Sequence, residues 1–236
     1  MSERIIVITG ANRGIGLGFV KSFLEKGDRI VAVARQPEKA IELKRLREMY
    51  EEHLFLVSFD VTDETAIQKA VDTVQKKWSS VDILINNSGI FGGKPQDSVK
   101  NLNLEIVKET FDVNVLGPIR VTRGFLPLLE RGKEKKIIHI TSLMGSIDDN
   151  KSGGDYAYRV SKAALNMMNR SLAHELREQR ICSVVMHPGW VKTDMGGPEA
   201  PISADESVRG MMTVISKLKP SDSGSFFNYQ GNHMPW

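Results

Sequence analysis

Near its start the chain reads Thr9-Gly10-Ala11-Asn12-Arg13-Gly14-Ile15-Gly16. This stretch joins an apolar run, Arg4–Thr9, to a segment with helical spacing, Gly14–Lys26. Glycines at a strand-to-helix turn let backbone amides approach a phosphate, and the helix N-terminus adds partial positive charge. The spacing is Gly-x3-Gly-x-Gly rather than the commoner Gly-x-Gly-x-x-Gly. We therefore predict a dinucleotide-binding turn mainly from the position of these glycines between a strand and a helix.

Beyond this turn, short apolar runs alternate with helical segments along the whole chain. Most runs are continuously hydrophobic, as expected of parallel strands covered on both faces. The alternation predicts an α/β fold over residues 1–236, one domain with a doubly wound, mostly parallel, Rossmann-like sheet. The expected strands are Arg4–Thr9, Arg29–Ala34, Leu54–Phe59, Val81–Asn86, Lys136–Thr141, Ile181–His187 and Ser225–Phe227, and the expected helices are Gly14–Lys26, Glu38–Tyr50, Asp63–Lys77, Leu104–Glu130, Tyr156–Gln179 and Ser203–Leu218.

Three segments rich in Gly, Pro and Ser follow expected strands at their carboxyl ends: Ile90–Ser98, Gly145–Gly154 and Met195–Ser203. Open α/β sheets bind ligands at that edge, so we expect these loops to surround the site. The alternative for each is a simple surface loop.

Composition bounds the class of protein. The 236 residues are 41% hydrophobic and 26% charged, with a net charge of +3, so nothing indicates binding to nucleic acid or to a membrane. The chain passes from Met1 into the apolar run Arg4–Thr9 with no room for a signal peptide, so we expect a cytoplasmic protein. The single Cys182 is expected to pack in the core, and His139 and His187 lack partners at metal-ligand spacing, so no metal site is expected.

The second expected strand indicates which dinucleotide binds. A carboxylate at its end would bind the ribose 2′-hydroxyl of NAD, but here Arg35 follows Ala34 directly. Arg13 in the glycine turn could close on the same ribose. Two cations without an anion favour the 2′-phosphate of NADP, which Arg binds in bidentate fashion. The alternative is that both arginines are solvated surface residues.

A second set of residues indicates acid/base chemistry. Tyr158 and Lys162 are four residues apart in a helical pattern and therefore share one face, and Ser142 follows an expected strand. A nearby ammonium would lower the pKa of the phenol, and bringing it from about 10 to about 7 needs roughly 4 kcal/mol. The Ser142 hydroxyl could hold the substrate oxygen. Tyr-x-x-x-Lys alone is common by chance.

Taken together, these motifs resemble the short-chain dehydrogenase/reductase family over essentially the whole chain, most closely sniffer-type carbonyl reductases and the bacterial C-factor group. They occur in the family's order: Thr9-Gly10-x3-Gly14-x-Gly16, Asn86-Asn87-Ser88-Gly89, Asn114, Ser142, Tyr158-x3-Lys162 and Pro188-Gly189. Ser88 stands where the family usually has Ala. The interval from Ser142 to Tyr158 is about three residues longer than usual, which enlarges a loop at Asp148–Lys151.

The resemblance implies a role for each matching residue. Tyr158 would be the proton donor, Lys162 would bind the nicotinamide ribose and tune Tyr158, Ser142 would orient the carbonyl, and Asn114 would hold a water behind the lysine. Asp60 would bind adenine, the Asn86–Gly89 segment would line the cofactor, and Thr193 would reach the carboxamide. The full set expected to bind NADP is Gly10, Asn12, Arg13, Gly14, Ile15, Gly16, Arg35, Asp60, Val61, Asn87, Gly89, Tyr158, Lys162, Pro188, Gly189, Val191 and Thr193.

The sequence therefore predicts NADPH-dependent reduction of a small ketone or aldehyde, with Tyr158 as general acid. Two alternatives remain: a cofactor-binding signalling or regulatory protein with little turnover, and an NAD-linked alcohol dehydrogenase, which Arg35 disfavours. The resemblance also implies pairing of the helices at Leu104–Glu130 and Tyr156–Gln179 between subunits, as a homodimer or homotetramer.

Overall fold

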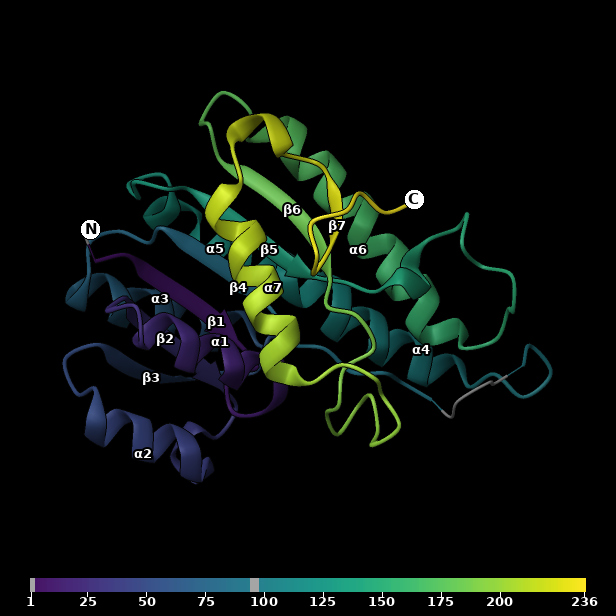
Figure 1. The fold of residues 1–236 in the computed structure, drawn as a ribbon, viewed down its shortest axis with the longest axis horizontal. Coiled ribbons are helices and arrows are strands. Elements are labelled where there is room, and N and C mark those ends of the chain that lie inside the picture. The colour runs from purple at the N-terminus through teal and green to yellow at the C-terminus, as the bar shows by residue number, and fades with distance from the viewer. Residues whose placement is uncertain (1–2, 94–97) are drawn as a thin grey trace.

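The computed structural model describes residues 3–93 and 98–236, and within them the strands form one sheet (Figure 1). The order is β3-β2-β1-β4-β5-β6-β7, and every neighbouring pair is parallel. Because β1 lies between β2 and β4, the winding reverses there, and a crevice opens at the carboxyl ends of these strands. The strands are β1 Ile5–Thr9, β2 Arg29–Ala34, β3 Leu54–Ser58, β4 Ile83–Asn86, β5 Lys136–Ile140, β6 Cys182–His187 and β7 Phe226–Asn228.

Helices cover both faces of the sheet, as the doubly wound prediction requires. Side chains of α1, α2 and α7 enter the core on one face, and those of α3 and α5 enter it on the other. The helices are α1 Gly14–Leu24, α2 Ile41–Met49, α3 Glu64–Lys77, α4 Leu104–Phe111, α5 Gly117–Leu129, α6 Tyr156–Glu175 and α7 Ala204–Lys217, with 3-10 turns η1 Pro37–Lys39, η3 Leu143–Gly145 and η4 Pro220–Asp222 and a π-helical turn η2 Asp112–Leu116.

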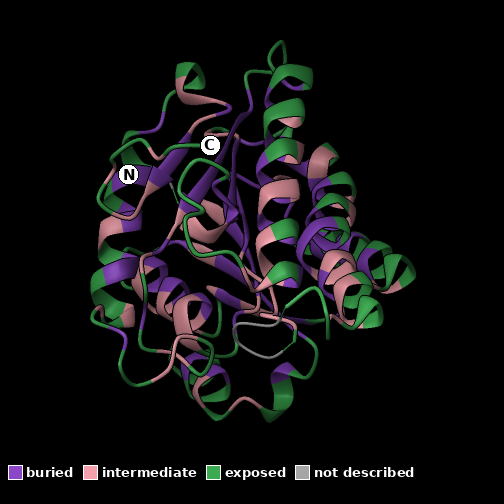
Figure 2. Ribbon diagram, turned by 90° about the vertical axis from the view of Figure 1, so that its right-hand side faces the viewer, coloured by how far each residue is buried: buried purple, intermediate pink, exposed green. Residues whose placement is uncertain are grey.

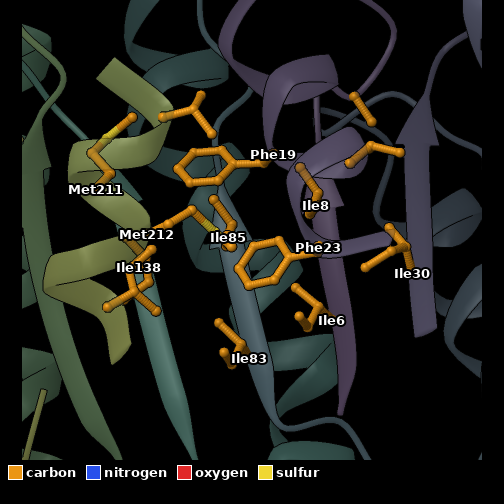
Figure 3. Close-up of a cluster of buried hydrophobic side chains, with 14 of the residues drawn as sticks. Ile6, Ile8, Phe19, Phe23, Ile30, Ile83, Ile85, Ile138, Met211 and Met212 are labelled. Atoms are coloured by element: carbon orange, nitrogen blue, oxygen red, sulfur yellow. The ribbon is translucent and has the colours of Figure 1, made fainter. Parts of the chain in front are cut away.

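The two-sided core explains why the strands are hydrophobic throughout. Alternate residues of β1 point to opposite faces, so Ile6 and Ile8 pack with Phe19 and Phe23 of α1 (Figure 3), whereas Val7 belongs to the core under α3 and α5. Full burial of a side chain such as Phe19 stabilises the fold by about 1.5–3 kcal/mol. Figure 2 shows the buried sheet between helices whose outer surfaces are exposed.

The predicted helix Leu104–Glu130 is correct in extent but not regular. A π turn interrupts it, and the Gly117 amide donates to the Asp112 carbonyl, five residues back. Pro118 has no N–H to donate to the Asn114 carbonyl, which explains why the α-helical ladder breaks here. The wider turn carries Asn114, whose side chain is fully buried.

Other boundaries differ from prediction by a few residues. The helix predicted at Glu38–Tyr50 is divided at Ala40, whose backbone is extended, and the helix predicted to end at Gln179 ends at Glu175. Within the described residues, no helix combines the length and apolarity needed to cross a membrane.

Candidate active site

The glycine turn after β1 needs its glycines for two separate reasons. Gly10 and Gly14 have φ angles of +64° and +53°, which favour glycine. A Cβ on Gly16 would lie 2.1 Å from the Gly10 carbonyl oxygen. The Asn87 amide then donates to the carbonyls of Thr9 and Gly10 at 2.9 and 3.2 Å, which ties the turn to the end of β4.

A cleft of about 690 Å³ opens at the carboxyl ends of the strands, next to this turn. Residues of several elements line it: the glycine turn, the carboxyl ends of β2, β3 and β4, the helix α6, and the segment after β6. Most residues predicted to bind the cofactor line it: Gly10, Asn12, Arg13, Gly14, Ile15, Arg35, Asp60, Val61, Asn87, Gly89, Tyr158, Lys162, Pro188 and Thr193.

Three of the predicted cofactor residues lie behind this lining. Gly16 packs against the Gly10 carbonyl, on the side of the turn away from the cleft lining. Val191 is buried and forms a β-bridge with Ile202, and a Cβ on Gly189 would lie 2.4 Å from the Ile202 side chain. These residues shape the wall rather than form its surface.

Both predicted phosphate-binding arginines line the cleft, and each faces a carboxylate. Arg13 donates to Asp194 at 2.5 Å, and Arg35 lies 4.0 Å from Asp60. Both guanidinium groups remain exposed, at 69% and 78% of their side-chain surface. The two cations were predicted from the sequence, but the pairing of Arg13 with Asp194 was not.

Tyr158 lines the cleft, and its hydroxyl shares a hydrogen bond with the Ser142 hydroxyl. Ser142 lies two residues past the end of β5 and caps η3, where its Oγ also accepts from the Met144 amide at 3.1 Å. Burial raises the pKa of Tyr158 to about 12, and the bond to Ser142 acts in the opposite direction. The net shift is therefore opposite to the lowering predicted from Lys162, because desolvation of the phenolate outweighs the effect of the hydrogen bond to Ser142.

Lys162 lies one helical turn after Tyr158, with its Nζ 5.5 Å from the centre of the Tyr158 ring. The Nζ donates to the Ile140 carbonyl at 2.9 Å, at the end of β5. Burial lowers the pKa of Lys162 to about 8. A Cβ on Gly145 would lie 2.7 Å from the Lys162 carbonyl carbon, so the turn after Ser142 packs directly on α6.

Asn114 lies behind Lys162 rather than on the cleft surface. Its Nδ2 donates to the Ile90 carbonyl at 2.8 Å and to Ser161 Oγ at 3.0 Å, and its Oδ1 accepts from the Ile90 amide at 2.9 Å. A Cβ on Gly89 would lie 3.1 Å from Asn114 Oδ1 and 3.6 Å from Lys162 Nζ. The asparagine therefore joins the loop after β4 to α6.

Asn86 is turned away from the cleft, unlike the rest of the Asn86–Gly89 segment. Its Nδ2 donates to Thr122 Oγ1 at 3.1 Å and lies 3.2 Å from His139 Nδ1, in the core. Burial, with a smaller contribution from Lys162, lowers the pKa of His139 to about 3, so this histidine is neutral. No cluster of three or more potential metal ligands occurs in the described ranges 3–93 and 98–236.

Sequence reasoning missed two residues beside Tyr158. Ser161 accepts from Asn114 and donates to the Tyr158 carbonyl at 2.8 Å, which links the two predicted site residues. Phe91 stacks on the Tyr158 ring with 4.9 Å between ring centres. The loop Ile90–Ser98 was predicted to border the site, but part of it lies outside the described residues, and no spacing signal singled out Phe91.

The sequence model of the family described as short chain dehydrogenase matches residues 4–202. This match covers most of the chain and includes the glycine turn, Ser142, Tyr158 and Lys162. The chain belongs to the short-chain dehydrogenase family. The resemblance drawn from the sequence is thereby confirmed.

Relatives agree with this short-chain dehydrogenase assignment. The C-signal of Myxococcus xanthus is 49% identical over 156 residues, which cover 66% of this chain and 93% of the C-signal. Among solved structures, the NADPH-bound carbonyl reductase from chicken fatty liver is 36% identical with a TM-score of 0.91, and the carbonyl reductase Sniffer of D. melanogaster is 34% identical with a TM-score of 0.93. Both alignments cover 100% of each chain.

Proposed function

We propose that this protein reduces a ketone or aldehyde to an alcohol with NADPH. The observation that carries the proposal is that Tyr158, hydrogen-bonded to Ser142, lines the same cleft as the glycine turn. Lys162, on the same helix face as Tyr158, completes the set. The likeness to an NADPH-bound carbonyl reductase over the whole chain supports both the cofactor and the substrate class.

The cleft suits a dinucleotide phosphate. Gly10 and Gly14 line the cleft without side chains, so the backbone amides of the turn are open to a pyrophosphate. Arg13 and Arg35 are exposed within the cleft, and no carboxylate directly follows β2 to bind a 2′-hydroxyl. These residues favour NADP over NAD. When bound, NADPH supplies the hydride that reduces the carbonyl carbon.

The chain's own residues supply the proton and the orientation. Tyr158 holds its proton throughout the neutral range because its pKa is raised to about 12, so it can donate Oη–H to the carbonyl oxygen. Ser142 Oγ lies within hydrogen-bonding reach of that hydroxyl and would hold the same oxygen. Lys162, fixed by Ile140, would bind the nicotinamide ribose.

An NADPH-oxidation assay over a panel of carbonyl compounds tests the proposal, with Ser142→Ala as the informative variant. We expect turnover by the parent protein, and a loss of most turnover in Ser142→Ala with NADPH affinity unchanged, because the hydroxyl serves the reacting oxygen. A fall in NADPH affinity as steep as the fall in kcat would assign Ser142 a structural role instead.

The 49% identity to the C-signal favours one second candidate, a cofactor-binding signalling or regulatory protein with little turnover. The complete Asn114, Ser142, Tyr158 and Lys162 set argues for catalysis. The same assay separates the two candidates: NADPH binding by calorimetry without oxidation by any carbonyl supports the second.

Exposed apolar side chains on α5 and α6 support a further part of the proposal, self-association through these helices. Ile119, Val160 and Met167 expose 36%, 50% and 67% of their surface. Sedimentation analysis tests the dimer or tetramer expected from this face, and a monomer at all concentrations would contradict it.

A further inference from the structure

Phe91 covers one face of the Tyr158 ring. The two ring centres lie 4.9 Å apart with 28° between the planes, a stacked arrangement. Phe91 follows Gly89 and Ile90, which line the cofactor cleft, but Phe91 itself lies outside that lining. It therefore contacts the phenol from a side other than the cofactor cleft.

The backbone on both sides of Phe91 is held in place. Before it, the Ile90 amide and carbonyl are both bonded to the Asn114 side chain, at 2.9 and 2.8 Å. After it, Gly92 has a φ of +70°, and a Cβ there would lie 1.8 Å from Thr110 Oγ1. Thr110 is fully buried and bonded to the Ile106 carbonyl at 2.7 Å.

These two anchors leave Phe91 little freedom to move away from Tyr158. The two anchoring residues, Thr110 and Asn114, both belong to the helix that runs from α4 into the π turn.

We propose that Phe91 is a positioning residue for the Tyr158 phenol: its stacked ring holds the phenol in the orientation that meets Ser142 and shields it from water. The kinetic part of this inference rests on the proposed carbonyl reduction, whereas the phenol's environment does not. A positioning residue that acts through Tyr158 should affect every substrate alike, whereas a wall of the substrate pocket would select substrates by size.

The contacts around the phenol define what the ring controls. Among the described residues, Lys162 of α6 is the charged group recorded over the Tyr158 ring, and Ser142 after β5 is the hydrogen-bond partner of its hydroxyl. Burial is the main cause of the raised pKa of Tyr158. Removing Phe91 admits water to one ring face and should bring that pKa back toward the ordinary value of about 10.

Three variants test the inference. Phe91→Ala removes the ring, Phe91→Leu restores apolar volume over the phenol, and Phe55→Ala is the matched control. Phe55 lies on β3, outside the residues that line the cleft, and its ring centre is 6.1 Å from that of Trp78. Each variant is assayed with one small and one bulky carbonyl, NADPH affinity is measured separately, and phenolate absorbance is titrated on the folded protein, with Tyr158→Phe identifying the signal.

For Phe91→Ala we expect kcat to fall about tenfold or more with both carbonyls, NADPH affinity to change less than about twofold, and Tyr158 to ionise at lower pH. Phe91→Leu should restore most of the kcat and should return the pKa of Tyr158 most of the way to its value in the parent protein. Phe55→Ala should change neither quantity. A loss confined to the bulky carbonyl, an equal loss of NADPH affinity, or an unchanged titration would overturn the inference. If the parent protein reduces no carbonyl, the proposed function is wrong, and the titration still decides whether Phe91 governs the phenol.

Discussion

Arg13 and Asp194 form an ion pair between the glycine turn and the segment after β6, with Nη1 and Oδ2 2.5 Å apart. Both residues line the cleft, and both side chains are about 70% exposed, at 69% and 73%. Arg13 is one of the two cations assigned to the 2′-phosphate of NADP. The carboxylate of Asp194 is therefore a competitor for the group that the phosphate needs.

Asp194→Asn should raise NADPH affinity because it frees the Arg13 guanidinium and removes a negative charge from the cleft. An exposed ion pair contributes about 1 kcal/mol or less, so the gain should be about fivefold or less. Fluorescence titration with NADPH measures it. In an Arg13→Gln background, Asp194→Asn should give a smaller gain, because no guanidinium is freed. A loss of affinity in Asp194→Asn alone would mean that Asp194 itself binds the cofactor.

Arg35→Asp should reverse the preference for NADPH over NADH. A carboxylate at this position repels the 2′-phosphate and accepts a hydrogen bond from the 2′-hydroxyl of NADH. The ratio of kcat/KM for the two cofactors is the measurement. Arg177→Asp, an exposed site just past the far end of α6, makes the same charge change and should leave the ratio alone; an unaltered ratio in Arg35→Asp would refute the assignment of Arg35.

Hydrophobic pattern was enough to predict the parallel sheet, because strands such as β1 are buried on both faces and read as continuous apolar runs. The same pattern could not show the π turn at Asp112–Leu116, since an apolar face continues through it while Pro118 alters the backbone hydrogen bonds. Helix ends such as Glu175 depend on local turns that periodicity does not resolve.

The candidate site was predictable where family motifs place a residue, as at Tyr158, Lys162 and Ser142. It was not predictable where two side chains meet only through the fold. Arg13 and Asp194 are 181 positions apart, and nothing near either residue signals the other. Phe91 is likewise an ordinary apolar residue in a glycine-rich loop until the contacts of Asn114 and Thr110 fix its position.

His139 should make the protein less stable in mild acid. Burial lowers its pKa to about 3, whereas the unfolded chain binds a proton near the ordinary value of 6.5. Between these pH values the unfolded state holds more protons, so the free energy of unfolding should fall as the pH drops below about 6.5, by up to about 1.4 kcal/mol per pH unit.

Urea denaturation at several pH values measures this slope. His139→Gln, which does not titrate, should have a flatter profile below pH 6.5, even if its overall stability is lower. His174→Gln on the exposed face of α6 is the matched control and should keep the parent's slope. Identical slopes in all three proteins would show that His139 does not govern the acid dependence.

Tyr156 and Tyr158 compete for the same catalytic role in the sequence, and the structure separates their surroundings. Tyr158 shares a hydrogen bond with Ser142 and lies beside Lys162, whereas Tyr156 begins α6 with 37% of its surface exposed. A step of two residues turns a helical side chain by about 200°, so both rings cannot face the same point. Only Tyr158 is positioned to donate a proton beside Ser142.

Tyr158→Phe should therefore fold normally, bind NADPH and lose at least about two orders of magnitude in kcat, the usual scale for a positioned general acid. Tyr156→Phe should keep its activity within a few-fold, and any loss should appear in stability or substrate affinity. Lys162→Met should impair both kcat and NADPH affinity, because Lys162 would serve the ribose while it lies 5.5 Å from the phenol ring. Steady-state kinetics with a good carbonyl substrate, together with NADPH titration, distinguish the three variants. In the described lining of this cleft, no other hydroxyl is followed by a lysine one helical turn later. Near-full activity in Tyr158→Phe would therefore exclude the phenol as the acid.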